Sequence, residues 1–131
     1  SLYARVVNWP YRVITSLTPG PYTIILQATR EVPKRLQNPK RRTIGLRVPD
    51  HAIVRAMLRS LGEPIMSSTL SLPRDDLPLT DVHEIEERIG NRIEMIVDGG
   101  PTGIEPTTVI DLSGGSIDVL RKGRGDVSKL V

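Results

Sequence analysis

Short, unbroken apolar runs rich in β-branched residues recur along the chain, each bounded by residues that favour turns. Runs of this length predict buried strands rather than helices. The strands expected on this basis are YTIILQ (22–27), TIGLRV (43–48), PIMSS (64–68), MIVD (95–98), TTVIDL (107–112) and IDVLRK (117–122). Only SGGS separates the last two runs, and this spacing predicts a hairpin.

A different pattern, with apolar residues three and four positions apart, predicts helices. It is clearest in HAIVRAMLRSL (51–61), which follows Asp50 and would end at Gly62. The other expected features are a helix at 8–17 capped by Asn8, a helix at 81–89 capped by Thr80 or Asp81 and closed by Gly90, one helical turn within the basic connection 28–42, and a loosely held tail at 123–131.

The order of these elements predicts the fold class. Strands and helices alternate and strands dominate the end, which is typical of an α/β (α+β) fold with a mixed, twisted, open sheet and helices packed on it. The 131 residues suit a single domain, 1–131. With no Phe, one Trp and three Tyr, its core must be built from aliphatic side chains.

Composition and charge exclude several classes of protein. The net charge of +3 permits an anionic ligand but does not by itself indicate nucleic acid, and the few aromatic residues argue against a single-strand stacking platform. The lack of cysteine excludes disulfides and thiolate metal sites. No apolar run approaches the roughly 18 residues of a membrane span, so we expect a cytoplasmic protein without membrane contact.

Hydroxyl side chains gather at the ends of predicted strands, where ligands bind in open sheets. They are Thr43, Ser67 to Thr69, Thr107 and Thr108. Arg47 and Arg121 lie within apolar strands, where burial is unfavourable unless the guanidinium is paired. Taken alone, each arginine fits a solvated position or a structural ion pair better. Their convergence with the hydroxyls would instead favour a site for an anionic ligand.

The other polar candidates favour structural interpretations. His51 and His83 have no HxxxH or HxH partner, so we expect no protein metal site, and no serine lies in a GxSxG motif. A cluster of cations within 28–42 could attract a polyanion, although its prolines and glutamate fit a solvated connection better. These cations are Arg30, Lys34, Arg35, Lys40, Arg41 and Arg42.

Five segments, taken in order, resemble the threonylcarbamoyl-AMP synthase (YrdC-like) family over about residues 18–127: PGPYTIIL, KRRTIGLRVPDH, LGEPIMSSTL, VDGGPTGIEPTTVIDL and VLRKGRGDV. The resemblance implies a twisted open sheet around a positively lined cavity. It also implies a nucleotidyltransferase that converts L-threonine, bicarbonate and ATP, with Mg²⁺, to threonylcarbamoyl-AMP and pyrophosphate. The threonylcarbamoyl group then passes to a tRNA adenosine.

The same resemblance assigns roles to the residues singled out above, with no side chain acting as acid or base. It implies that Thr43, Thr69 and Arg121 bind ATP, and that Arg47, Ser67 and Thr107 bind threonine.

The chain departs from the family pattern at two places. SSTLS replaces the usual STSAN, which is similar to the YciO branch. The N-terminal TDTxYGL-type segment and Lys-x-Arg motif do not occur, so we expect a fragment or a degenerate relative that is inactive in isolation. An exposed sheet edge would then favour self-association. Two alternatives to a synthase remain: a YciO-type RNA-binding module for tRNA or double-stranded RNA without enzymatic activity, and an inert domain.

Overall fold

The computed structural model describes residues 3–6, 8–128 and 130. Internal contacts divide the chain into two compact units. We call Ser1–His51 with Pro106–Val131 the sheet unit, and Ala52–Glu105 the helical unit. Among the described residues, no helix is long and apolar enough to cross a membrane.

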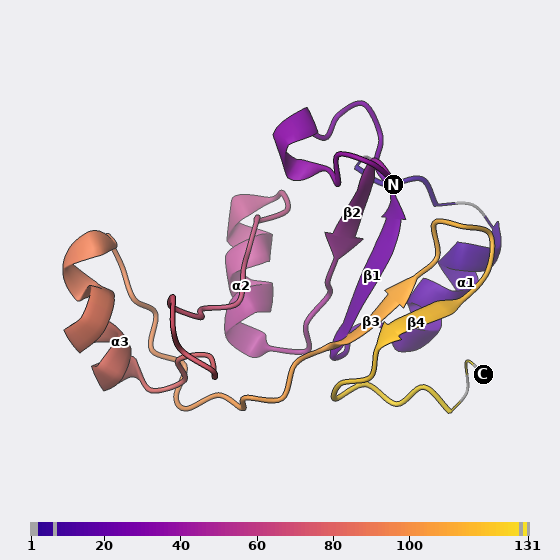
Figure 1. Cartoon of the computed structure of the whole chain (residues 1–131). Helices are drawn as coiled ribbons and strands as arrows, with labels where there is room; N and C mark the ends of the chain where they lie inside the picture. Colours follow the sequence, from indigo (N-terminus) through magenta and orange to yellow (C-terminus); the bar gives the residue numbers. More distant parts are fainter. Residues whose placement is uncertain (1–2, 7, 129, 131) are drawn as a thin grey trace. The chain divides into compact units, whose positions relative to one another are not determined.

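The sheet unit contains a four-stranded mixed sheet in the spatial order β2-β1-β3-β4 (Figure 1). The central strand β1 (Tyr22–Gln27) pairs antiparallel with β2 (Thr43–Leu46) and parallel with β3 (Thr108–Asp111). β3 in turn pairs antiparallel with β4 (Asp118–Arg121), the hairpin that the sequence predicts. The expected mixed α/β fold is therefore confirmed, although β2, β3 and β4 are each shorter than their apolar runs.

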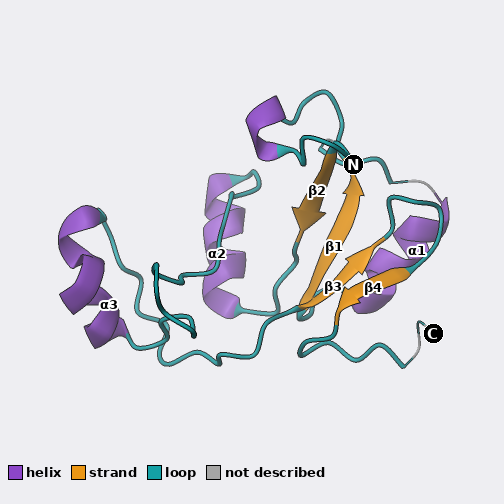
Figure 2. Cartoon of the chain, in the orientation of Figure 1, coloured by secondary structure: helices purple, strands orange, loops and turns teal. Residues whose placement is uncertain are grey.

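One face of the sheet, the core face, carries the aliphatic core. Ile24, Leu26 and Ile110 occupy alternate positions of β1 and β3 and are at most 2% exposed. Helix α1 (Asn8–Leu17) lies beside the sheet (Figure 2), and Val13, Ile14 and Leu17 of this helix pack against the core. The predicted bounds of this helix are confirmed, whereas the predicted Asn8 cap lies outside the side chains that the structure describes.

The start of the tail is fixed by hydrogen bonds at the end of the sheet where β3 begins. Thr108, which is 0% exposed, donates its hydroxyl to the Gly125 carbonyl at 2.7 Å and accepts from the Gly123 amide at 3.0 Å. A Cβ at Gly125 would collide with the ring of Tyr22, so this close approach requires glycine. The expectation of a loosely held tail is wrong for residues 123–126, and within that tail 129 and 131 lie outside the described residues.

The helical unit contains α2 (Ala52–Leu61) and α3 (Val82–Ile89). Gly62 ends α2 as predicted, with φ +75° and its amide donating to the Leu58 carbonyl. Asp81 caps α3 by accepting from the His83 amide at 3.1 Å. The helix ends at Ile89 with Gly90 as its C-cap, as predicted, and the Gly90 amide donates to the Glu86 carbonyl. Gly90 has helical dihedral angles and begins a 3₁₀ turn, η2 (Gly90–Arg92).

An exposed ion pair ties α3 to the loop before it. Arg88 donates to Asp75 at 2.7 Å and lies 3.6 Å from Glu84, one helical turn away. The hydrogen bond to Asp75 raises the pKa of the Arg88 guanidinium.

Two of the predicted strands, 64–68 and 95–98, are wrong. Both segments lie in the helical unit and have no ladder partner among its residues, all of which are described. Their apolar side chains stay largely in solvent, with Met66 75% and Met95 78% exposed. An apolar run becomes a strand only beside another strand, and the helical unit supplies none. The helical turn expected within 28–42 is present as η1 (Lys34–Leu36).

Candidate functional site

The face of the sheet opposite the core, which we call the open face, carries the predicted site residues of the sheet unit, although Thr43 is only 6% exposed. Successive strand residues point to opposite faces, so Thr23 and Ile25 face away from the side of Ile24. On β2, a Cβ added to Gly45 would lie 3.2 Å from the Thr23 methyl carbon, which places Gly45 beside Thr23 on the same face. Gly45 therefore adds no side chain beside Thr23.

A pair of threonine hydroxyls joins β1 to the residue that precedes β3. The Thr23 and Thr107 hydroxyl oxygens lie 2.7 Å apart, and either can be the donor. Thr107 immediately precedes Thr108, whose backbone pairs with Tyr22 in the parallel register. The pair is partly buried.

Arg121, the last residue of β4, is anchored on Thr107. Its Nη2 donates to the Thr107 hydroxyl at 3.1 Å and its Nε donates to the Thr107 carbonyl at 3.0 Å. Both acceptors are neutral, and among the described residues Arg121 makes no ion pair with a carboxylate. The exposed guanidinium is thus held in one orientation while its positive charge stays uncompensated, an arrangement suited to an anionic ligand.

Thr43 and Arg47 lie along the same face at different distances from this anchor. Thr43 pairs with Gln27, four residues along β1 from Thr23, which is about 13 Å at strand spacing. Leu46 pairs with Ile24 in the antiparallel register, so Arg47, the next residue, lies opposite Thr23. Strand alternation then directs Arg47 to the open face, where its side chain is exposed.

Ser67 and Thr69 belong to the helical unit, in the irregular segment that follows α2. Both are exposed, and the intervening Ser68 donates its hydroxyl to the Thr69 carbonyl at 3.2 Å. Their assignment to the ligand site stays a prediction, as do the roles assigned to the four residues of the sheet unit.

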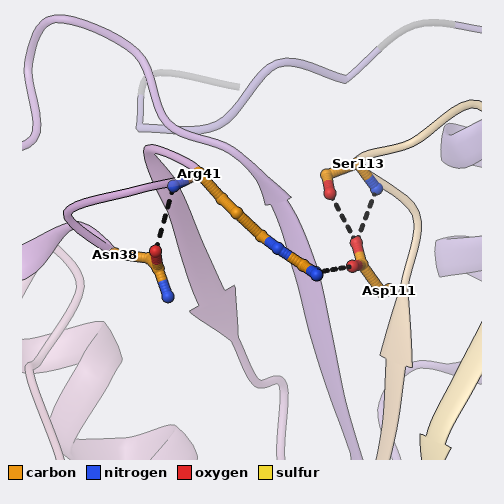
Figure 3. A network of polar contacts seen from close by, with 4 residues as sticks. All are labelled: Asn38, Arg41, Asp111 and Ser113. Atoms are coloured by element: carbon orange, nitrogen blue, oxygen red, sulfur yellow. Dashed lines mark hydrogen bonds and ion pairs between the residues drawn. The ribbon is translucent and has the colours of Figure 1, made fainter.

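A second polar network lies where β3 ends (Figure 3). The buried Asp111 carboxylate accepts from the Ser113 amide at 2.8 Å and its hydroxyl at 2.6 Å. Arg41 reaches from the loop before β2 to within 3.4 Å of the same carboxylate, while the Asn38 side chain accepts from the Arg41 backbone amide at 3.0 Å. This network pairs Arg41 within the protein, whereas the other cations of 28–42 are exposed and make no ion pair among the described residues.

The sequence reasoning missed Thr23, although it contacts the predicted Thr107. Thr23 stands inside the apolar run YTIILQ, and a threonine there fits a strand without any ligand. Strand alternation places Thr23 on the same face as Ile25, opposite Ile24, and this alternation could have indicated that its hydroxyl faces the site. Thr108, by contrast, is a predicted strand-end hydroxyl that serves the fold, since both of its hydrogen bonds go to the tail.

The arrangement defines a class of protein: a mixed α/β domain with threonine hydroxyls and an unpaired guanidinium on the open face of its sheet. Residues 2–123 match the sequence model of the Sua5/YciO/YrdC family, which is described as "Telomere recombination". The chain belongs to this family. The resemblance to the YrdC-like threonylcarbamoyl-AMP synthase family, with YciO proteins among its relatives, is thereby confirmed.

Individual relatives include both YciO proteins and synthases. The chain is 48% identical over 132 residues to an uncharacterized protein of Haemophilus influenzae and 46% identical over 127 residues to the uncharacterized protein YciO of Escherichia coli. These alignments cover 100% and 97% of the chain but only 64% and 62% of the relatives. A mouse threonylcarbamoyl-AMP synthase is 30% identical over 125 residues, covering 89% of the chain and 44% of that protein.

Solved structures give the same grouping. The crystal structure of E. coli YciO matches with a TM-score of 0.91 and 44% identity, over 98% of this chain and 63% of that one. The crystal structure of P. abyssi Sua5 complexed with L-threonine matches with a TM-score of 0.81 and 26% identity, over 94% of this chain and 36% of that one. The chain is therefore a YrdC-like domain related to threonylcarbamoyl-AMP synthases.

Proposed function

We propose that this chain binds ATP and L-threonine as part of a protein that forms threonylcarbamoyl-AMP for tRNA modification. The observation that carries the proposal is the Arg121 guanidinium, which neutral acceptors on Thr107 hold in place. A fixed cation without a carboxylate partner is suited to an anionic oxygen of a ligand. The L-threonine bound to the P. abyssi relative supports an amino acid as one of the two ligands.

In the proposed site, both ligands contribute anionic groups. Arg47, Ser67 and Thr107 would hold threonine, with Arg47 facing its carboxylate. Thr43, Thr69 and Arg121 would hold ATP, with Arg121 at the phosphates. Mg²⁺ would enter with ATP, since magnesium is commonly bound through substrate phosphates and only one or two protein carboxylates.

The proposed reaction needs positioning and charge stabilisation rather than a covalent intermediate with the protein. Bicarbonate and the threonine amine would give a carbamate with release of water. A carbamate oxygen would then form a bond to the α-phosphorus of ATP while the bond to pyrophosphate breaks. Aligning the two groups and neutralising the developing charge are the contributions expected of the arginines and Mg²⁺. Because the chain spans 62–64% of the length of its YciO-type relatives, we propose ligand binding for the chain and turnover for the whole protein.

A titration followed by amide NMR tests this proposal. ATP with Mg²⁺, and separately L-threonine, should shift the amides of Thr43, Arg47, Thr107 and Arg121, with GTP and L-alanine as matched controls for selectivity. Shifts of the Ser67 and Thr69 amides would indicate that these two residues also respond to the ligand. A well-dispersed spectrum that neither ligand changes would contradict the proposal.

A second candidate function is RNA binding through the basic segment within 28–42. The observation in its favour is that Arg30, Lys34, Arg35, Lys40 and Arg42 are exposed and make no ion pair in the described structure. Salt separates the two functions. Affinity for tRNA or double-stranded RNA should fall steeply between low and moderate salt, whereas a nucleotide with two or three phosphate contacts should respond weakly.

A further inference from the structure

The Thr23 and Thr107 hydroxyls have a limited number of protons and lone pairs, and those left unused determine which hydrogen bonds a ligand can make with the pair. Each hydroxyl has one proton to donate and two lone pairs to accept with. One proton is used between the two oxygens at 2.7 Å, and one lone pair of Thr107 is filled by Arg121 Nη2. Whichever threonine donates to the other, the pair keeps one proton for a further partner.

The direction of that hydrogen bond decides which hydroxyl can donate to a ligand. When Thr23 donates, both lone pairs of the Thr107 oxygen are occupied, by Thr23 and by Arg121, and the Thr107 proton is free. Thr107 can then donate but cannot accept. Two donors polarise its hydroxyl in the same sense, so the remaining proton forms a stronger hydrogen bond to an anionic acceptor.

The pair is partly buried, and the position beside Thr23 on β2 is a glycine. Gly45 has no side chain, although its backbone lies so close to Thr23 that an added Cβ would be 3.2 Å from the Thr23 methyl carbon. The Thr23 hydroxyl has no other side-chain or backbone partner in the described structure, so nothing competes with Thr107 for it.

We infer that Thr23 is a positioning residue: its hydroxyl donates to Thr107, turns the Thr107 proton outward and makes this point of the site select an anionic oxygen over an ammonium group. The inference rests on the proposed function, because it specifies how the same site reads its ligands. The anionic oxygen belongs either to the carboxylate of threonine or to a phosphate of ATP, both of which offer the same acceptor chemistry.

The test compares Thr23→Val, which removes the hydroxyl and keeps the shape, with Thr23→Ser, which keeps the hydroxyl. Thr15→Val on α1 is the matched control for the same chemical change elsewhere. Isothermal titration with L-threonine, with L-threoninol, which lacks the carboxylate, and with ATP measures each Kd in the full 131-residue chain. Thr23→Ala repeats the test if the valine variant does not fold.

Thr23→Val removes one of the two donors that polarise the Thr107 hydroxyl. The lost bond is between neutral groups and contributes about 0.5–1.5 kcal/mol, so we expect a Kd about two- to tenfold higher. The loss should appear for L-threonine if the acceptor is its carboxylate, or for ATP if it is a phosphate. Thr23→Ser and Thr15→Val should stay within about twofold of the parent chain, and L-threoninol should lose little.

Two results would overturn the inference alone, and a third would overturn the proposed function as well. Equal weakening of L-threonine, L-threoninol and ATP would assign Thr23 a purely structural role. Unchanged binding by Thr23→Val would show that Thr107 needs no such orientation. If the parent chain bound neither L-threonine nor ATP, the proposed function would fail and this inference with it.

Discussion

The sheet unit and the helical unit differ in how much apolar surface they bury. The sheet unit has a continuous core in which Ile24, Leu26, Ile110 and Leu112 are nearly inaccessible. In the helical unit the buried hydrophobic residues are Leu79 and Ile89, each 9% exposed, and α2 contains no buried residue. Its exposed large apolar residues are Met57, Leu61, Ile65, Met66, Leu77, Ile93, Met95, Val97 and Ile104.

This difference separates two sources of structure along one chain. The strands of the sheet unit are far apart in sequence and are held by one another's hydrogen bonds and by a shared core. The helices of the helical unit rely on local features, such as the Asp81 cap and the Gly62 stop. We therefore expect the sheet unit to unfold cooperatively and the helical unit to open at lower free energy.

The largest effect is expected from truncating the core of the sheet unit. Ile110→Ala should lower the free energy of unfolding of the sheet unit by about 2–5 kcal/mol, because Ile110 is 0% exposed and the change leaves a cavity. Met66→Ala, at a residue 75% exposed, should change it by no more than about 0.5 kcal/mol. Urea unfolding followed by the amides of β1 and β3 measures both. Similar losses in the two variants would remove the contrast between the units.

A smaller loss is expected from the hydroxyl that fixes the tail. Thr108→Val keeps the side-chain shape but leaves the Gly125 carbonyl and the Gly123 amide without their partner. The free energy of unfolding should fall by about 1–3 kcal/mol, and the amide of Gly123 should exchange faster with solvent. Thr108→Ser is the control and should retain most of the stability. If both variants exchanged alike, the hydroxyl would not be what holds the tail.

The smallest effect is expected in the helical unit and should stay there. Asp81→Ala removes the acceptor for the His83 amide and should destabilise α3 by about 1 kcal/mol. Carbon chemical shifts over Val82–Ile89 should report lower helicity, while the urea midpoint of the sheet unit stays constant. Asp81→Asn, which can still cap, should preserve the helix. A shifted midpoint for the sheet unit would contradict independent opening of the two units.

The sequence predicted elements well where its local pattern agreed with a partner elsewhere in the chain. The limits of α1 and β1 were predicted to the residue, and Gly62 ended α2 as expected. The segments 64–68 and 95–98 have the same apolar character as true strands, yet they form none. Local composition reports whether a segment fits a sheet, but a neighbouring strand decides whether it joins one.

The candidate site was predictable in part for a similar reason. The resemblance assigned Arg121 to ATP and Thr107 to threonine, and the structure brings these two residues into direct contact. Thr23 was missed because its contribution depends on pairing between β1 and β3, across 84 positions of sequence. The structural role of Thr108 was equally invisible, since its partners are backbone groups of the tail.

The central claim is that Thr107 and Arg121 form an anion-binding point on the open face of the sheet. The most direct measurement is the Kd for ATP with Mg²⁺ and for L-threonine in Arg121→Gln, compared with Arg12→Gln on the exposed side of α1. The account predicts at least about a tenfold weaker Kd for one or both ligands in Arg121→Gln, through the loss of a charge-assisted contact, and no change in Arg12→Gln. Equal affinity of Arg121→Gln and the parent chain for both ligands would contradict it.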